Sequence, residues 1–142
     1  MGQYGRFQED TAHPVVPSSE KKRILIAEDD PDQRDLMRAF LKAEGFEVFV
    51  CGDGRRGMEI FQTRGDVDLL IADLQMPHVT GLELALGLST WKRDLPVMIV
   101  SGYTRTPEQQ LLMEERGWMF FQKPFTVPQM LSAIHELFSP AI

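Results

Sequence analysis

The chain has 142 residues, 43% of them hydrophobic, with 15 lysines and arginines against 21 aspartates and glutamates, a formal net charge of −6. This length and apolar content fit one packed domain and exclude wholesale disorder, and the acidic balance argues against nucleic acid or an anionic membrane as the main partner. A single cysteine, Cys51, excludes an intramolecular disulfide and a cysteine-cluster zinc site.

Residues 1–22 differ in composition from the rest of the chain. They contain glycine, proline, serine and glutamine without apolar periodicity, which predicts a flexible N-terminal tail. They also lack the apolar core of a signal peptide, and no apolar stretch in the chain approaches the roughly 18 residues needed to span a bilayer. We therefore expect a soluble, cytoplasmic protein.

Short apolar runs alternate with segments of helical periodicity from residue 24 onward. The predicted elements, in chain order, are a strand at 24–27, a helix at 32–44, a strand at 47–50, a helix at 55–63, a strand at 68–73, a helix at 82–91, a strand at 96–101, a helix at 107–116, a strand at 118–122 and a helix at 127–138. Five continuously apolar strands separated by helices predict an α/β fold, a doubly wound parallel sheet with helices on both faces. Such a sheet binds ligands beyond the carboxyl ends of its strands.

Polar side chains stand at those strand ends. Glu28-Asp29-Asp30 follow the first strand, Asp73 ends the third, Ser101 ends the fourth, and Lys123 follows the fifth. Carboxylates from Glu28, Asp29 and Asp73 would repel one another if they met. A divalent cation removes this conflict, and ligands that are all oxygen suit Mg²⁺. The strand ends therefore predict a magnesium site.

The same residues suit phosphoryl transfer. Asp73 is the best candidate for the nucleophile because it ends the central, most buried strand, and a carboxylate that attacks phosphorus gives an acyl phosphate. The ammonium of Lys123, the hydroxyl of Ser101 and the metal would hold the phosphoryl oxygens. Each residue alone also has a simpler interpretation: Asp30 before Pro31 is typical of a helix cap, and the others are common turn, strand-end or surface residues. Their conjunction favours the chemical interpretation.

Four segments carry a resemblance to a known family: ILIAEDDPDQR, DLLIADLQMPHVTGLEL, PVMIVSGYT and FFQKPF. With them, residues 23–138 resemble the receiver domain of bacterial two-component response regulators. The resemblance implies a flavodoxin-like sheet with strand order 2-1-3-4-5, and divides the chain into a tail at 1–22 and a receiver domain at 23–142. That domain fills the chain, so we expect no DNA-binding output domain in it.

The resemblance also implies a role for each matching residue. Asp73 becomes the phosphoacceptor, Glu28 and Asp29 the acidic pair for Mg²⁺ with the backbone carbonyl of Gln75 as a further ligand, Ser101 the switch hydroxyl, Lys123 the phosphate contact and Phe120 the aromatic switch residue. The family's Lys-Pro peptide, here Lys123-Pro124, is usually cis. Gln75 and Tyr103 occupy the positions that flank the path of attacking water. We expect the bulk of Tyr103 to slow loss of the phosphoryl group.

Four positions depart from the family pattern. Glu28 replaces an aspartate and Ser101 a threonine, and both keep the functional group. Thr80 replaces an aspartate before Gly81. Phe120 replaces a frequent tyrosine and has no phenol to form a hydrogen bond, so its movement would depend on packing alone.

Three alternatives remain open. Residues 52–57, GDGRRG, are a literal G-x-G-x-x-G after a strand, the form of a dinucleotide- or flavin-binding motif. It lies on the second strand, however, where Asp53-Gly54 can form a turn and Gly57 a helix contact. A Mg²⁺-dependent aspartyl phosphatase would need a second carboxylate at the position of Gln75. A pseudo-receiver that only binds a partner would not need the complete set of strand-end residues.

We therefore expect a two-component phosphorelay protein that catalyses only its own phosphorylation and dephosphorylation and is otherwise no enzyme. A sensor histidine kinase or phosphotransfer protein would phosphorylate Asp73. The change would alter a surface at residues 105–138 for a downstream protein or a second copy, with no direct nucleic acid or membrane contact. The kinase, the pathway and the choice between a freestanding regulator and part of a hybrid kinase stay open.

Overall fold

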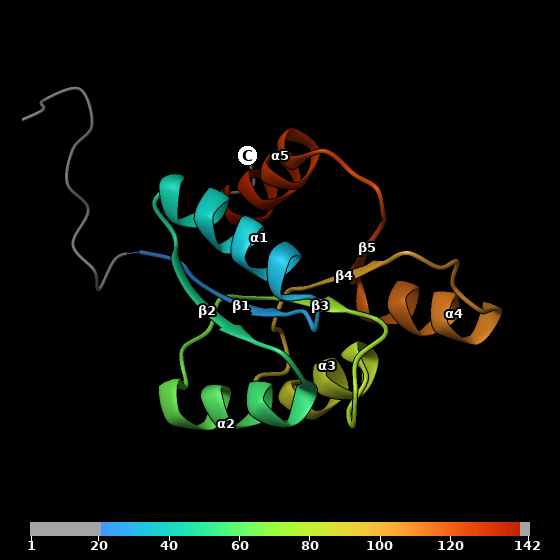
Figure 1. Cartoon of the computed structure of the whole chain (residues 1–142). Helices are drawn as coiled ribbons and strands as arrows, with labels where there is room; N and C mark the ends of the chain where they lie inside the picture. Colours follow the sequence, from blue (N-terminus) through green and yellow to red (C-terminus); the bar gives the residue numbers. More distant parts are fainter. Residues whose placement is uncertain (1–20, 140–142) are drawn as a thin grey trace, which may run out of the picture.

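The computed structural model of the protein describes residues 21–139, so most of the expected tail at 1–22 lies outside the described residues. Five strands alternate with five helices (Figure 1). Their bounds are β1 Arg23–Ala27, α1 Pro31–Ala43, β2 Glu47–Cys51, α2 Gly54–Arg64, β3 Leu69–Asp73, α3 Gly81–Ser89, β4 Val97–Ser101, α4 Pro107–Arg116, β5 Met119–Gln122 and α5 Val127–Phe138. All ten predicted elements are confirmed.

Local capping explains where the helices begin and end. Asp30 caps α1 by accepting from the backbone N–H groups of Asp32 and Gln33, and Gly45 follows the helix with a positive φ of 99°, which costs glycine little. The helix expected at 82–91 ends earlier, at Ser89. Trp91 lies beyond it and stacks on Phe61 of α2, with ring centroids 5.9 Å apart.

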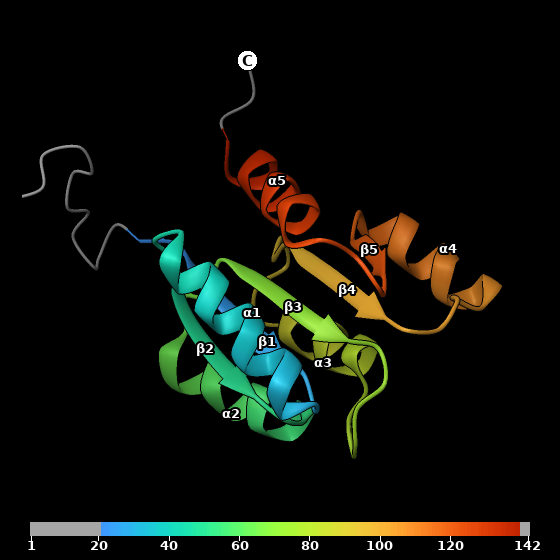
Figure 2. The ribbon, with the colours of Figure 1, turned by 45° about the horizontal axis from the view of Figure 1, so that its top comes forward.

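The sheet has the order β2-β1-β3-β4-β5, with every neighbouring pair parallel (Figure 2). This confirms the strand order that the resemblance implied. In the register, Ala27 pairs with Ala72, Asp73 with Val100, and Ser101 with Gln122. The carboxyl ends of β1, β3, β4 and β5 therefore lie along one edge of the sheet.

The two faces of the sheet carry separate apolar cores. Side chains of α1 and α5 pack on one face, around Ile26, Ile71 and Met130, and both helices lie on the same side of the sheet in Figure 1. Side chains of α2, α3 and α4 pack on the other face, around Leu70 and Ile99. Because β1, β3 and β4 are buried from both sides, they hold the loops at their ends in fixed positions.

Among the helices of residues 21–139, none has the length and apolar character required to cross a membrane.

Candidate functional site

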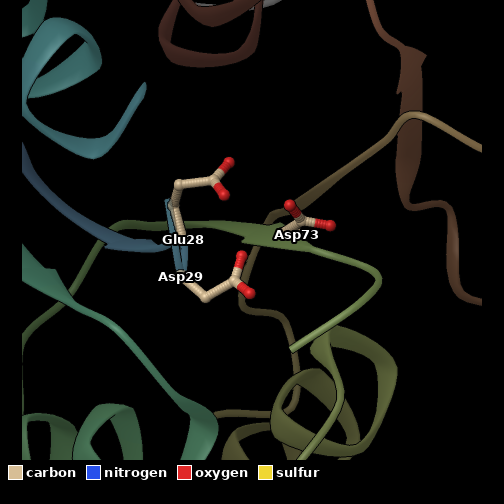
Figure 3. Close-up of side chains that lie close together, drawn as sticks. All are labelled: Glu28, Asp29 and Asp73. Atoms are coloured by element: carbon tan, nitrogen blue, oxygen red, sulfur yellow. The ribbon is translucent and has the colours of Figure 1, made fainter. Parts of the chain in front are cut away.

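Three carboxyl groups meet at the carboxyl edge of the sheet. Glu28 and Asp29 follow β1 and Asp73 ends the adjacent β3 (Figure 3). Each offers an oxygen that lies within 4.8 Å of the others. Glu28 is 1% exposed and Asp73 is 7% exposed, whereas Asp29 is exposed. The cluster, which we call the acidic rim, is thus open to solvent on the side of Asp29.

Lys123 joins two members of the acidic rim. Its Nζ donates to Glu28 Oε1 at 2.8 Å and to Asp73 Oδ2 at 3.0 Å. Partial burial disfavours the charged form of Lys123, but the hydrogen bonds to the two carboxylates outweigh it, so the pKa of Lys123 is raised. The ammonium therefore stays protonated and holds the two buried carboxylates together. Lys123 precedes Pro124 through a cis peptide bond, as expected.

Glu28 has an unusual environment for a carboxyl group. Burial is the main cause that raises its pKa to about 7, and the bond from Lys123 only partly opposes that. The N–H of Asp30 also donates to Glu28 Oε2 at 3.2 Å. Burial therefore makes Glu28 easier to protonate than an ordinary glutamate.

Asp73 is held by its second oxygen as well. The backbone N–H of Gln75 donates to Asp73 Oδ1 at 2.9 Å. Behind it, a Cβ on Gly81 would lie 2.2 Å from the carbonyl oxygen of Asp73. The loop after β3 thus folds so tightly back on Asp73 that only glycine fits at position 81.

Ser101 ends β4 and Phe120 lies in the adjacent β5, and the side chains of both contact groups outside the acidic rim. Ser101 is fully buried, and its Oγ accepts from the backbone N–H of Tyr103 at 3.0 Å. The half-buried ring of Phe120 lies under the guanidinium of Arg105, 4.3 Å from its centroid, a cation–π contact. Tyr103 itself is 68% exposed. Of the predicted residues, Glu28, Asp73, Gln75 and Lys123 are joined by hydrogen bonds to the rim carboxylates. Ser101 is linked to Lys123 only through the backbone, where its carbonyl accepts from the Lys123 N–H at 2.7 Å.

Two sequence features have structural roles instead. Asp30 caps α1 and is not a member of the acidic rim. In the G-x-G-x-x-G segment, Asp53 caps α2, and a Cβ on Gly54 would lie 2.5 Å from Cβ of Val79. A side chain of the protein therefore fills the space that a bound pyrophosphate would need at Gly54.

The donor set of the acidic rim fits Mg²⁺. Its ligands are all carboxylate oxygens, which this ion prefers, and three carboxyl groups face one ammonium. Asp29 is exposed, so a hydrated ion can reach the cluster. The residues present therefore match a divalent cation in both ligand type and charge.

An apolar groove of about 270 Å³ lies beside the acidic rim, between α1 and the start of α5. It is lined by Leu36, Met37, Phe40, Lys123, Phe125 and Leu131, among others. Leu36 is 56% exposed and Phe40 is 39% exposed. Neither this groove nor the contact of Arg105 with Phe120 was predicted, because no spacing in the sequence indicates which helices or loops meet.

Known proteins resemble this chain along most of its length. The family model described as "Response regulator receiver domain" matches residues 24–135. A probable transcriptional regulatory protein of Picosynechococcus is 30% identical over 125 residues, which covers 84% of this chain and 50% of that protein. The transcriptional activator protein PfeR of Pseudomonas aeruginosa is 32% identical over 119 residues, 84% of this chain and 37% of PfeR. The chain thus spans about half the length or less of these relatives.

Solved structures of other proteins have a similar fold. The response regulator TrrA of Thermotoga maritima, solved in complex with Mg²⁺-BeF, has a TM-score of 0.73 and 27% identity, covering 82% of this chain and 99% of TrrA. A CheY-like receiver domain protein from Methanospirillum hungatei has a TM-score of 0.77 and 25% identity, covering 83% of this chain and 94% of its own.

Proposed function

The chain belongs to the response regulator receiver family, and from this we propose that Asp73 is its phosphoacceptor and that the acidic rim binds Mg²⁺ for the transfer. A receiver domain is a signalling phosphoacceptor in two-component systems rather than a conventional enzyme, and its partner is a histidine kinase. The observation that carries the residue-level proposal is the position of Asp73. Its carboxylate is bonded to Lys123 and lies within reach of Glu28 and Asp29.

In the proposed step, an oxygen of Asp73 attacks the phosphorus of a phosphohistidine in line with the bond that breaks. A phosphorus–oxygen bond forms, and the electron pair of the broken phosphorus–nitrogen bond returns to the imidazole. Lys123 donates its hydrogen bond to a phosphoryl oxygen in place of Asp73 Oδ2. Charge on that oxygen is thereby stabilised by a group already within 3.0 Å of the reacting carboxylate.

The groups proposed to hold Mg²⁺ are the carboxylates of Asp29, Asp73 and Glu28 and the backbone carbonyl of Gln75. When bound, the ion would neutralise negative charge between the phosphoryl group and the carboxylates. TrrA was solved with Mg²⁺-BeF, and the oxygen-only donor set of this chain supports the same requirement here. Glu28 is buried and Asp29 is exposed, so Asp29 is the more accessible ligand.

Ser101 and Phe120 are proposed to pass the change on to residues 105–138. The Ser101 hydroxyl would release the N–H of Tyr103 to donate to the phosphoryl group, and the loop that carries Arg105 would then be free to shift from Phe120. A downstream protein or a second copy of the chain would bind the altered surface.

In this proposal, Tyr103 also shields the acyl phosphate, so Tyr103→Ala should lose its phosphoryl group faster than the wild type. An unchanged or slower loss would contradict that role.

We also propose that the apolar groove receives a helix of the protein that donates the phosphoryl group. Lys123 lines the groove and contacts Asp73, so a helix seated there would lie next to the phosphoacceptor. The exposed Leu36 and Phe40 provide the apolar contacts that an amphipathic helix needs.

Treatment with acetyl phosphate and Mg²⁺ tests the phosphoacceptor. The wild type should gain one phosphoryl group by intact mass, and Asp73→Ala should gain none. An Asp73→Ala chain that is phosphorylated as fast as the wild type would overturn the proposal.

The groove is tested by comparing a protein donor with a small one. Leu36→Ala should slow transfer from a histidine kinase that phosphorylates the wild type, and leave labelling by acetyl phosphate unchanged. Leu111→Ala is the matched control, because Leu111 of α4 is also 56% exposed and lies outside the groove. Equal slowing by both substitutions, or slowing with both donors, would contradict a docking role.

A further inference from the structure

Arg34 reaches back from α1 to the peptide group that joins the first two acidic residues of the rim. Its Nη1 donates to the backbone carbonyl oxygen of Glu28 at 3.1 Å. On the other side, the N–H of Glu28 donates to the carbonyl of Cys51 at 3.0 Å. The backbone of Glu28 is therefore held from both α1 and β2, and the Cα of Asp29 is fixed by the peptide that follows.

Gly52 leaves the space that the Arg34 guanidinium occupies. A Cβ on Gly52 would lie 2.8 Å from Arg34 Nη1, which is too close for two unbonded heavy atoms of this kind. Gly52 does not have a positive φ, so its backbone does not require glycine. The absence of a side chain at position 52 therefore serves the contact between Arg34 and Glu28.

In the described part of the chain, no carboxylate forms a salt bridge with Arg34. Its bond to the Glu28 carbonyl places a positive charge beside the acidic rim without neutralising a particular member of it. As a charge alone, Arg34 would repel an incoming cation. As a hydrogen-bond donor, it would instead fix the ligand-bearing loop in place.

On the basis of the magnesium site proposed above, we propose that Arg34 is a positioning residue that orients the Glu28–Asp29 peptide and thereby increases the affinity of the acidic rim for Mg²⁺. The two effects of Arg34 have opposite signs. Removing a mere charge would tighten cation binding, whereas removing the positioning bond would weaken it. Metal affinity therefore decides between them.

The test is a titration of the full chain with Mn²⁺, an oxygen-preferring substitute for Mg²⁺, with free Mn²⁺ counted by electron paramagnetic resonance and the bound ion displaced by Mg²⁺. Arg34→Gln should weaken binding by about tenfold, the lower end of the range for loss of a hydrogen bond that orients a metal ligand. Arg34→Lys, which keeps a donor, should restore part of the affinity. Gly52→Ala should also weaken binding, because its methyl group displaces a guanidinium that is still present.

Two variants serve as controls. Arg38→Gln removes an arginine from the exposed surface of the same helix, and Gly102→Ala adds a methyl group where no atom lies within 4 Å. Both should bind Mn²⁺ as the wild type does. If Arg34→Gln does not fold by circular dichroism, Gly52→Ala decides the matter by the same criterion.

Unchanged or tighter binding in Arg34→Gln or in Gly52→Ala would overturn the inference while leaving the proposed magnesium site intact. Asp29→Asn separates the two questions. If the wild type binds no Mn²⁺, or if Asp29→Asn binds it equally well, the magnesium site itself is wrong and the role of Arg34 is wrong with it.

Discussion

Lys123 bonds two carboxylates at once, and burial makes the more deeply buried of them, Glu28, easier to protonate than an ordinary carboxylate. The pKa of Glu28 is raised from 4.5 to about 7, chiefly by burial. A carboxyl group with a raised pKa binds its proton more tightly in the folded chain than in the unfolded one. Its contribution to stability is thus complete below pH 4.5 and is lost as the pH rises to about 7.

We therefore expect the free energy of unfolding of the wild type, relative to Glu28→Gln, to fall as the pH rises between about 4.5 and 7 and to level off above that. Urea unfolding of both chains in the presence of EDTA, at a series of pH values, measures this difference. A difference that increases over the same interval would contradict the raised pKa of Glu28.

Asp29 and Asp30 are neighbours in the sequence with separable roles. Asp30→Ala removes the cap of α1 and should lower the free energy of unfolding by about 1 kcal/mol, with little change in divalent-cation affinity. Asp29→Asn should instead weaken divalent-cation binding and change the free energy of unfolding little. Calorimetric unfolding and Mn²⁺ titration of the two variants check this, and equal losses of metal affinity in both would place Asp30 in the metal site.

Single residues were predictable where they follow a strand, and less so where they bond to the backbone. Glu28, Asp29, Asp73 and Lys123 could be assigned to one edge because parallel strands end together. Arg34 could not, since its partner is a carbonyl group that any residue at position 28 would provide. The spacing of the sequence carries no signal for such a contact.

Elements were predictable to within one or two residues because their caps are encoded locally. Thr106 and Thr126 begin α4 and α5 with reciprocal bonds to Gln109 and Gln129. The end of α3 was predicted less well, since Trp91 continues the apolar pattern but packs on Phe61 of another helix. Tertiary packing, absent from local periodicity, decides that boundary.

The tight return of the loop between β3 and α3 is also an element-scale property, and Gly81→Ala tests it. Its added Cβ would lie 2.2 Å from the backbone of Asp73, so we expect destabilisation of about 1–3 kcal/mol. Gly102→Ala, with no atom within 4 Å of the added Cβ, should change stability much less. Urea unfolding compares the two variants. Equal effects would contradict the close packing of Gly81 against the backbone of Asp73.

At the scale of the whole molecule, the order of the strands assembles the site. Because β1 lies directly beside β3, the acids after β1 meet Asp73, and Lys123 reaches both from beyond β5. Apolar runs alone predicted a parallel sheet with helices on both faces. The specific order came from family resemblance, because periodicity does not determine which strands are neighbours.

Magnesium should stabilise the whole fold, because an ion that binds only the folded chain shifts the unfolding equilibrium. At a concentration of 100 times the dissociation constant, the gain should be about 2.7 kcal/mol. Thermal unfolding with and without Mg²⁺ measures it. The melting temperature should rise in the wild type and change little in Asp29→Asn, and an equal rise in both would indicate binding elsewhere.

Chemical mapping of the phosphorylated residue shows whether Asp73 is the phosphoacceptor. The wild type, phosphorylated with acetyl phosphate and Mg²⁺, is reduced with sodium borohydride, which converts an aspartyl phosphate into homoserine, and is then digested and sequenced by mass spectrometry. We expect homoserine at position 73 and at no other aspartate. Homoserine at position 29 or 30, with Asp73 intact, would contradict it.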